Sequence, residues 1–152
     1  MNSLWIARRS FTSSPARLGL YKDFLAQVKP TVPAVAAKAF NAKMIEQPDR
    51  FWGDNVSIHI FDVREPYEWN EERLPYANYT GRGKLEGMIA SESLVPDASA
   101  DILLYCSNGN RSMLAAESLQ QLGYKNVKFL SGGIGAWKKE HFGTHRNIRE
   151  VV

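Results

Sequence analysis

Cysteine is nearly absent from this chain of 152 residues, which contains only Cys106. A single thiol excludes a disulfide within the chain and a zinc site built from several cysteines. The three histidines, His59, His141 and His145, do not have metal-motif spacing with the cysteine. We therefore expect no metal and no other cofactor, and any thiol chemistry must use Cys106.

Long apolar stretches are also missing, although hydrophobic residues make up 44% of the chain. No run is long enough to cross a bilayer, which takes roughly 18 or more apolar residues, so we expect no transmembrane helix and no membrane partner. The length suits one domain of ordinary size.

Acidic residues are absent from the first 22 positions, where four of the 19 basic residues lie. The remaining chain has 15 basic and 16 acidic residues, so its charge is nearly balanced. A nucleic-acid-binding domain would keep a basic patch on its folded surface. We therefore expect no nucleic-acid partner.

The N-terminal stretch is rich in Arg, Ser and Thr as well as free of acids. This composition is typical of a mitochondrial transit peptide, whereas a secretory signal would need a continuous apolar core. A basic, disordered tail is the remaining alternative. We expect residues 1–22 to target the protein to mitochondria, to the matrix, with cleavage between Arg9 and Lys22. Residues 23–152 are then expected to form a single domain.

The hydrophobic pattern predicts strands that alternate with helices. Runs of apolar and β-branched residues predict strands at 56–63, 101–105 and 126–130. We expect helices at 21–28, at 33–46, from Pro66 to Glu72, from about Ser112 to a cap at Gly123, and after Gly132. Such alternation indicates an α/β domain with a mostly parallel sheet.

Two finer expectations concern the segments between these strands. Pro33 is placed in the first turn of the 33–46 helix. The apolar face of that helix is expected to contain Val35, Ala39, Ala42 and Ile45. Residues 74–88, with three glycines, are expected to be irregular.

Cys106 directly follows the strand at 101–105 and begins the loop 106–112, which leads into a helix. Open α/β sheets bind ligands at the carboxyl ends of their strands. Gly109 lets the backbone curl, Arg111 adds a permanent positive charge, and N–H groups at a helix start favour an anion. These features favour a thiolate, the reactive form of cysteine. The alternative is a buried structural cysteine, which the composition of this loop disfavours.

Four segments resemble signatures of the rhodanese family, and they occur in the family's order. They are residues 62–69 (Asp-Val-Arg-Glu-Pro-Tyr-Glu-Trp), the loop 104–112, residues 122–127 and residues 130–137. The resemblance spans roughly residues 33–140. It implies a rhodanese-like α/β fold, with a parallel five-stranded sheet flanked by helices on both faces. It also implies transfer of sulfane sulfur through a persulfide on Cys106.

The expected site has Cys106 as its nucleophile and the following loop as its binding cradle. The loop residues are Ser107, Asn108, Gly109, Asn110, Arg111 and Ser112. Arg82, between two glycines, is a candidate contact for an anionic donor such as thiosulfate, and a solvated surface arginine is the alternative. Asp62 is expected to be a structural ion pair or loop anchor, and the role of Arg64 is left open.

One segment departs from the family pattern. Where rhodaneses usually have Gly-His-Ile-Pro-Gly-Ala, this chain has Glu-Arg-Leu-Pro-Tyr-Ala at residues 72–77. The proline and the alanine remain, but the glycines and the histidine are absent. The fold is little affected, and the conformation of this loop is left open.

Two other functions compete with sulfur transfer. Four residues separate Cys106 from Arg111, whereas the cysteine phosphatases, which resemble this fold, use five and enclose a tetrahedral phosphate. A phosphatase or arsenate reductase-like enzyme would also need a general acid, and none is identifiable. A non-catalytic rhodanese-like module typically lacks the cysteine.

The expected partners are small molecules. The donor is a compound such as thiosulfate or glutathione persulfide, and the acceptor is glutathione, another thiol or cyanide. The loop has only one charge, so the choice between thiosulfate, mercaptopyruvate and persulfides stays open, as does the oligomeric state.

Overall fold

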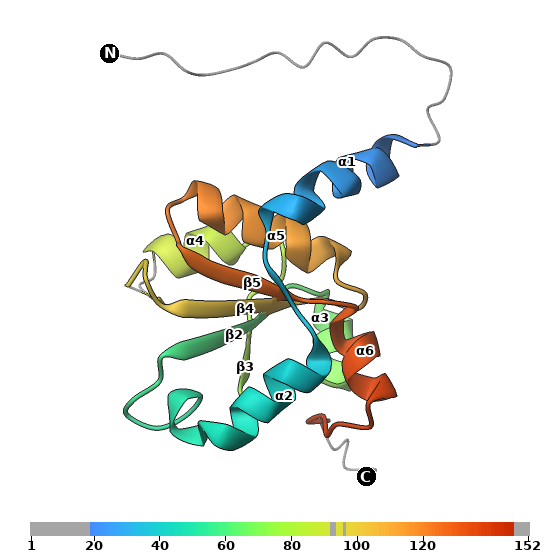
Figure 1. Ribbon diagram of the computed structural model, residues 1–152. Helices are drawn as coiled ribbons and strands as arrows, with labels where there is room; N and C mark the ends of the chain where they lie inside the picture. The colour runs from blue at the N-terminus through green and yellow to red at the C-terminus, as the bar shows by residue number, and fades with distance from the viewer. Residues whose placement is uncertain (1–18, 92–93, 96, 148–152) are drawn as a thin grey trace.

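Five parallel strands form the centre of the molecule, in the order β1-β5-β4-β2-β3 (Figure 1). The computed structural model describes residues 19–91, 94–95 and 97–147. The strands are β1 (Ala34–Val35), β2 (Ile58–Asp62), β3 (Ala77–Tyr79), β4 (Asp101–Tyr105) and β5 (Asn126–Leu130). Because every neighbouring pair is parallel, the carboxyl ends of all five strands lie along one edge. The predicted α/β fold with a five-stranded parallel sheet is confirmed.

Helices cover both faces of this sheet. One face is covered by α1 (Leu20–Val28), α4 (Leu85–Ser91) and α5 (Asn110–Gln121), and the other by α2 (Ala37–Glu46) and α6 (Gly133–Lys139). The short helix α3 (Pro66–Glu71) follows β2, and single 3-10 turns occupy Lys29–Thr31 and Pro48–Arg50. None of the described helices is both long and apolar enough to cross a membrane.

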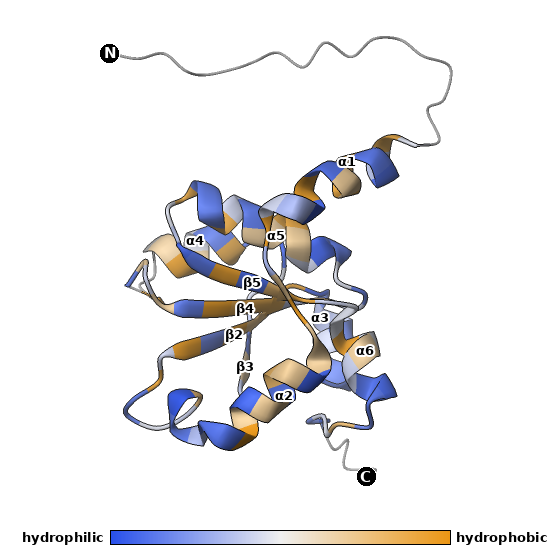
Figure 2. Ribbon diagram, in the orientation of Figure 1, coloured by the Kyte–Doolittle hydropathy of each residue, from blue (hydrophilic) through white to orange (hydrophobic). Residues whose placement is uncertain are grey.

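The central strand β4 contributes to the cores on both faces. Ile102 and Leu104 pack into the core beneath α5, and Leu103 and Tyr105 pack into the core beneath α2 and α6. This alternation follows from the two-residue period of a strand. Figure 2 shows apolar residues concentrated along the strands. A strand buried on both faces reads in the sequence as a continuous apolar run, which is why 101–105 could be found there.

The strands predicted at 101–105 and 126–130 are confirmed at those bounds, and the helix predicted at 21–28 corresponds to α1. The strand predicted at 56–63 is shorter, and the helix after the cysteine begins at Asn110 rather than near Ser112. Residues 1–18, most of the expected targeting segment, lie outside the described residues. Positions 20–22 of that segment belong to α1.

The prediction for residues 33–46 is wrong in two respects. Pro33 does not begin a helix, because the next two residues form β1, in which Val35 pairs with Leu130. The helix begins at residue 37, and its buried face includes Phe40 and Met44, whereas Ile45 is 71% exposed. Phe40 and Met44 lie one turn apart and carry more apolar surface than the alanines of the expected face, so their burial stabilises the fold more.

Residues 74–88 are not irregular as predicted. They contain β3, which pairs with β2 at the sheet edge, and α4, which buries Leu85 and Ile89 one turn apart. β3 has only three residues, with the polar Asn78 at its centre. So short a segment carries no apolar run that sequence reasoning could detect.

Candidate active site

Cys106 lies at the carboxyl edge of the sheet, one residue beyond the end of β4. β4 is central and pairs with β5 on one side and β2 on the other, so the loops after all three strands meet here. The cysteine is a free thiol and is fully buried. The parallel topology thus places the thiol where open α/β sheets bind ligands.

The loop wraps around the sulfur of Cys106. The Gly109 backbone N–H donates a hydrogen bond to Sγ at 3.1 Å. The buried Ser112 hydroxyl lies 3.5 Å from Sγ and donates to the Gly109 carbonyl, and Asn108 Oδ1 lies 3.9 Å from Sγ. Gly109 has φ 99°, a conformation that glycine adopts readily. The Gly109 N–H is the kind of donor that a thiolate or a persulfide anion requires, whereas Asn108 Oδ1 accepts from the thiol.

A glycine-rich turn at residues 132–135 packs against the cysteine loop and is hydrogen-bonded to it. The Ile134 N–H donates to the Cys106 carbonyl at 2.9 Å, and the Gly135 N–H donates to the Ser107 carbonyl at 3.1 Å. Gly133 has φ 59°, and a Cβ there would lie 2.3 Å from the Cys106 carbonyl oxygen. The close approach of the two segments therefore requires a glycine at 133. The motif at 130–137 holds the cysteine loop in place.

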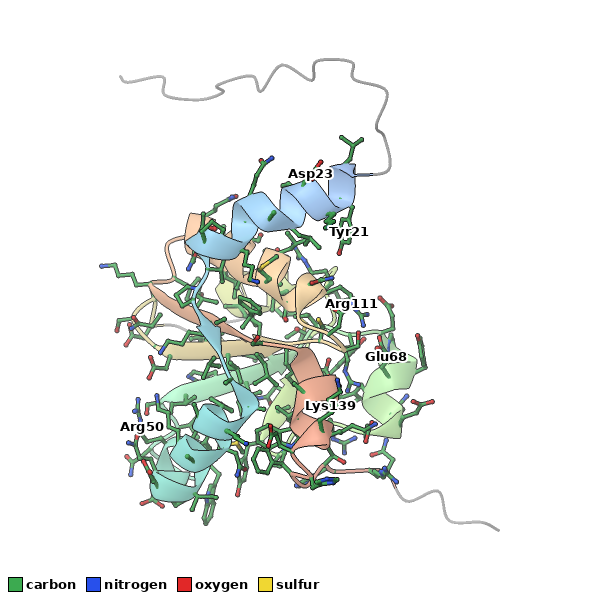
Figure 3. The ribbon with its side chains drawn as sticks, turned by 45° about the vertical axis from the view of Figure 1, so that its right-hand side comes forward. Tyr21, Asp23, Arg50, Glu68, Arg111 and Lys139 are labelled. Atoms are coloured by element: carbon green, nitrogen blue, oxygen red, sulfur yellow. The ribbon has the colours of Figure 1, made fainter. Side chains whose placement is uncertain are left out.

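Arg111 forms a bidentate ion pair with Glu68 of α3. Its two terminal nitrogens lie 2.8 and 2.9 Å from the two Glu68 oxygens, and one of them also donates to the Ser107 hydroxyl at 3.0 Å. Figure 3 shows the two side chains at the same end of the molecule. These hydrogen bonds raise the pKa of Arg111 and lower that of Glu68. Arg111 therefore ties the cysteine loop to α3.

Glu68 is a functional candidate that the sequence reasoning missed. In the sequence it stands only as one member of the 62–69 motif, with no partner indicated. In the structure it also caps α3, because the Glu65 N–H donates to its carboxylate at 2.9 Å. An acid three residues into a Pro-started helix is a recognisable capping signal. Nothing in the sequence indicates that the same carboxylate meets Arg111, 43 residues away.

Asp62 and Arg64 form a buried ion pair beside this loop. Arg64 Nη2 lies 2.7 Å from Asp62 Oδ2, and the side chains are 4% and 0% exposed. Arg64 also donates to the Glu72 carbonyl at 2.5 Å. The structural interpretation of Asp62 agrees with this geometry. Arg64, left open by the sequence, is bound by protein groups.

Arg82 lies beyond the end of β3, at the same sheet edge as Cys106. One of its nitrogens donates to Glu86 at 2.7 Å, and the same Glu86 oxygen accepts from the Ser118 hydroxyl at 2.6 Å. The Arg82 side chain is 37% exposed. Its partner in the structure is thus α4, and the remaining guanidinium donors can serve a bound anion.

The segment that departs from the family pattern has a left-handed residue, Tyr76, just before β3. Tyr76, where the family usually has glycine, adopts a left-handed conformation with φ 60°. Its ring lies 6.2 Å from that of Phe51, a contact that offsets part of the cost of this conformation. The turn still leads directly into β3. In this chain a tyrosine therefore makes the left-handed turn.

In the described part of the chain, no group of three or more His, Cys, Asp or Glu side chains could hold a metal ion. The chemistry available at the site is that of a thiol, backbone N–H groups and two arginines held by carboxylates.

Residues 43–140 match the sequence profile of the rhodanese-like domain. Over 84 residues the chain is 33% identical to the thiosulfate sulfurtransferase GlpE of Coxiella burnetii, covering 55% of this chain and 75% of that protein. Over 137 residues it is 28% identical to a Schizosaccharomyces pombe protein named as a candidate mitochondrial thiosulfate sulfurtransferase, covering 84% and 94%.

Solved structures agree in fold. A Rhodopseudomonas palustris protein of unknown function, described as a candidate tyrosine phosphatase, is 25% identical with a TM-score of 0.69, covering 82% of this chain and 93% of that one. The thiosulfate sulfurtransferase of Pseudomonas aeruginosa has the same TM-score of 0.69 at 21% identity, over 83% of this chain and 23% of that one.

Proposed function

The chain belongs to the family of rhodanese-like domains, and on that premise we propose that it is a sulfurtransferase that carries sulfur as a persulfide on Cys106. One observation supports this most directly. The Gly109 N–H points at Cys106 Sγ from 3.1 Å, in a loop at the carboxyl edge of the sheet. A donor in this position favours the anionic sulfur that both halves of the reaction require.

In the first half-reaction the Cys106 thiolate attacks the outer sulfur of a donor such as thiosulfate or glutathione persulfide. The bond between that sulfur and the rest of the donor breaks, and sulfite or glutathione leaves with the electron pair. The terminal sulfur of the persulfide is anionic. We assign its binding to the N–H groups of residues 107–112, with Arg111 adding positive charge behind the loop.

In the second half-reaction a thiolate or cyanide removes the outer sulfur and restores the Cys106 thiolate. Cys106 is the only cysteine of the sequence, so the chain cannot resolve its persulfide as an internal disulfide. The acceptor is therefore a separate molecule.

Arg82 is proposed to contact an anionic donor at the mouth of the site. It follows β3 at the carboxyl edge and is partly exposed, with Glu86 holding one side of its guanidinium. We expect Arg82→Ala to raise the KM for thiosulfate more than it lowers kcat, because the contact binds substrate and reacting state alike. Steady-state kinetics with cyanide as acceptor measure both constants. An unchanged KM would make Arg82 a surface residue.

The phosphatase alternative meets two structural difficulties. The four-residue spacing between Cys106 and Arg111 gives a small loop. The guanidinium that would clamp a phosphate is held on both terminal nitrogens by Glu68. A non-catalytic binding role is disfavoured by the presence of the thiol and its N–H donor.

A mitochondrial location, in the matrix, is part of the proposal. The acid-free, Arg-rich composition of residues 1–22 supports it, and one relative carries a mitochondrial name. Fusing residues 1–22 to a fluorescent protein and following its import tests this directly. A diffuse cytosolic signal would contradict it.

Intact mass of the purified protein after incubation with thiosulfate tests the chemistry. We expect a gain of one sulfur atom that a thiol reductant removes and that Cys106→Ser does not show, because only the Cys106 thiolate can form the persulfide. If thiosulfate and glutathione persulfide both leave the mass unchanged, the proposed sulfur transfer is wrong.

A further inference from the structure

A pocket of about 330 Å³ lies beside the cysteine loop, on the side that faces α1. Residues 108–110 of the loop line one part of it, and Leu25, Ala26 and Lys29 line another. Met113 and Phe129 line its apolar part. The pocket is thus large enough for a small peptide-like molecule and opens beside the residues that surround the thiol.

The pocket combines a cation with amide groups and an apolar surface. Lys29 is exposed, and it forms no ion pair among the described residues. Asn108 and Asn110 add amide groups that can donate or accept hydrogen bonds. This combination suits a small organic molecule with a carboxylate at one end, because an ammonium group attracts a carboxylate while the apolar surface receives the rest.

The wall formed by α1 and the turn after it packs against the core of the domain. Val28, next to Lys29, is 3% exposed and packs in the same core cluster as Met113. In Figure 1 α1 lies over the start of α5. Residues 25–34 precede the stretch 43–140 that matches the family profile. This wall of the pocket therefore lies outside the part of the chain that the profile describes.

Two residues of the pocket also touch the reactive sulfur. The Gly109 N–H lies 3.1 Å and Asn108 Oδ1 3.9 Å from Cys106 Sγ. A molecule that fills the pocket therefore contacts two residues that surround the thiol. In such a complex its anionic end would lie at Lys29 and its reacting end near Asn108, both of which line the pocket.

We propose that this pocket binds the non-reacting part of the sulfur acceptor, a low-molecular-weight thiol that carries a carboxylate, and that Lys29 recognises this carboxylate. The inference rests on the proposed sulfur transfer and names the class of acceptor. The acceptor thiolate attacks the outer sulfur of the Cys106 persulfide and forms a new S–S bond. The bond between Cys106 Sγ and the outer sulfur breaks, and its electron pair returns to Cys106 as the thiolate.

Glutathione and its dimethyl ester are suitable probes, because they share the thiol and the peptide and differ in the two carboxylates. We expect wild-type protein to have a lower KM for glutathione than for the ester. Lys29→Ala should raise the KM for glutathione by up to about fivefold, as for an exposed ion pair, and leave the KM for the ester unchanged. Lys125→Ala removes the same charge from an exposed site at the amino end of β5 and should change neither constant.

Two further measurements separate this inference from the proposed function. Ala26→Phe places a ring in the pocket from an exposed position and should raise the KM for both thiols, while cyanide, which needs no pocket, is used as before. Equal KM changes for glutathione and its ester in Lys29→Ala would overturn the role of Lys29. Unchanged thiol kinetics in Ala26→Phe would overturn the pocket. Both results leave the proposed function intact if the persulfide forms and cyanide accepts its sulfur.

Discussion

A single residue, Glu68, holds the Arg111 guanidinium and, through it, the cysteine loop. The pair is bidentate and partly buried, with side chains 14% and 32% exposed. Glu68→Gln keeps the shape but removes the charge that holds the guanidinium. We expect kcat/KM for thiosulfate to fall about tenfold, because small displacements of a reactive loop cost large factors in rate.

Steady-state kinetics of Glu68→Gln and of Glu71→Gln provide the comparison. Glu71 is exposed on the same helix and should tolerate the change. If both variants retain wild-type kcat/KM, the Arg111–Glu68 pair does not position the loop for catalysis.

The candidate site residues in the cysteine loop could be proposed from the sequence because their signals are local. The loop begins directly after an apolar strand and contains Cys106, Gly109 and Arg111 within six residues. In the structure the Gly109 N–H donates to the Cys106 sulfur. The partner of Arg111 could not be found, because Glu68 is brought to it by the packing of α3 against the loop. Such a pair depends on tertiary structure rather than on spacing.

Among the elements around the site, the turn at residues 132–135 approaches the cysteine loop so closely that position 133 has no room for a side chain. Gly133 has a left-handed backbone, and a Cβ there would lie 2.3 Å from the Cys106 carbonyl oxygen. We expect Gly133→Ala to lower the free energy of unfolding by about 2–4 kcal/mol, from the left-handed conformation and the steric overlap together. Urea unfolding measures the change.

Gly87→Ala is the matched control for this substitution. Gly87 lies on the exposed side of α4, and a Cβ there would meet no atom within 4 Å. Alanine has the higher helix propensity, so this variant should be as stable as wild type or slightly more stable. A Gly133→Ala protein as stable as Gly87→Ala would show that the two loops can separate at little cost.

Element prediction succeeded where a strand has several apolar residues and failed where an element is short. β4 is buried on both faces and reads as an apolar run, and β5 has buried apolar residues between exposed polar ones. In contrast, β1 and β3 contain two and three residues and are held by pairing with their neighbours. Pro33 stands at a position that equally suits a helix start or the entry to an edge strand. Residues 34–35 form a strand because they pair with β5, which lies far away in the sequence.

For the molecule as a whole, three glutamates connect separate elements. Glu68 joins α3 to Arg111 of α5, Glu72 joins the end of α3 to Lys138 of α6, and Glu86 joins α4 to Ser118 of α5. The hydrogen bonds from Arg111 lower the pKa of Glu68. Burial alone would raise the pKa of Glu72 and Glu86, but their hydrogen bonds and nearby cations outweigh it, so both pKa values are also lowered.

The sign of the pH dependence follows from these shifts. Each folded-state pKa lies below the ordinary value of 4.5, so the folded protein binds fewer protons than the unfolded chain near that pH. The stabilisation is therefore complete above pH 4.5 and is lost as the pH falls through the folded-state values. We expect the free energy of unfolding, measured by urea titration at a series of pH values, to fall steadily below pH 4.5.

Glu68→Gln isolates one part of this effect. The variant cannot gain a proton at residue 68, so its free energy of unfolding should fall less steeply in acid than that of wild type, and the two curves should converge at low pH. Glu71→Gln, exposed on the same helix, should follow the wild-type curve. Parallel curves for wild type and Glu68→Gln would mean that the ion pair contributes no pH-dependent stability. The acid sensitivity would then arise elsewhere, with Glu72→Gln and Glu86→Gln as the variants that locate it.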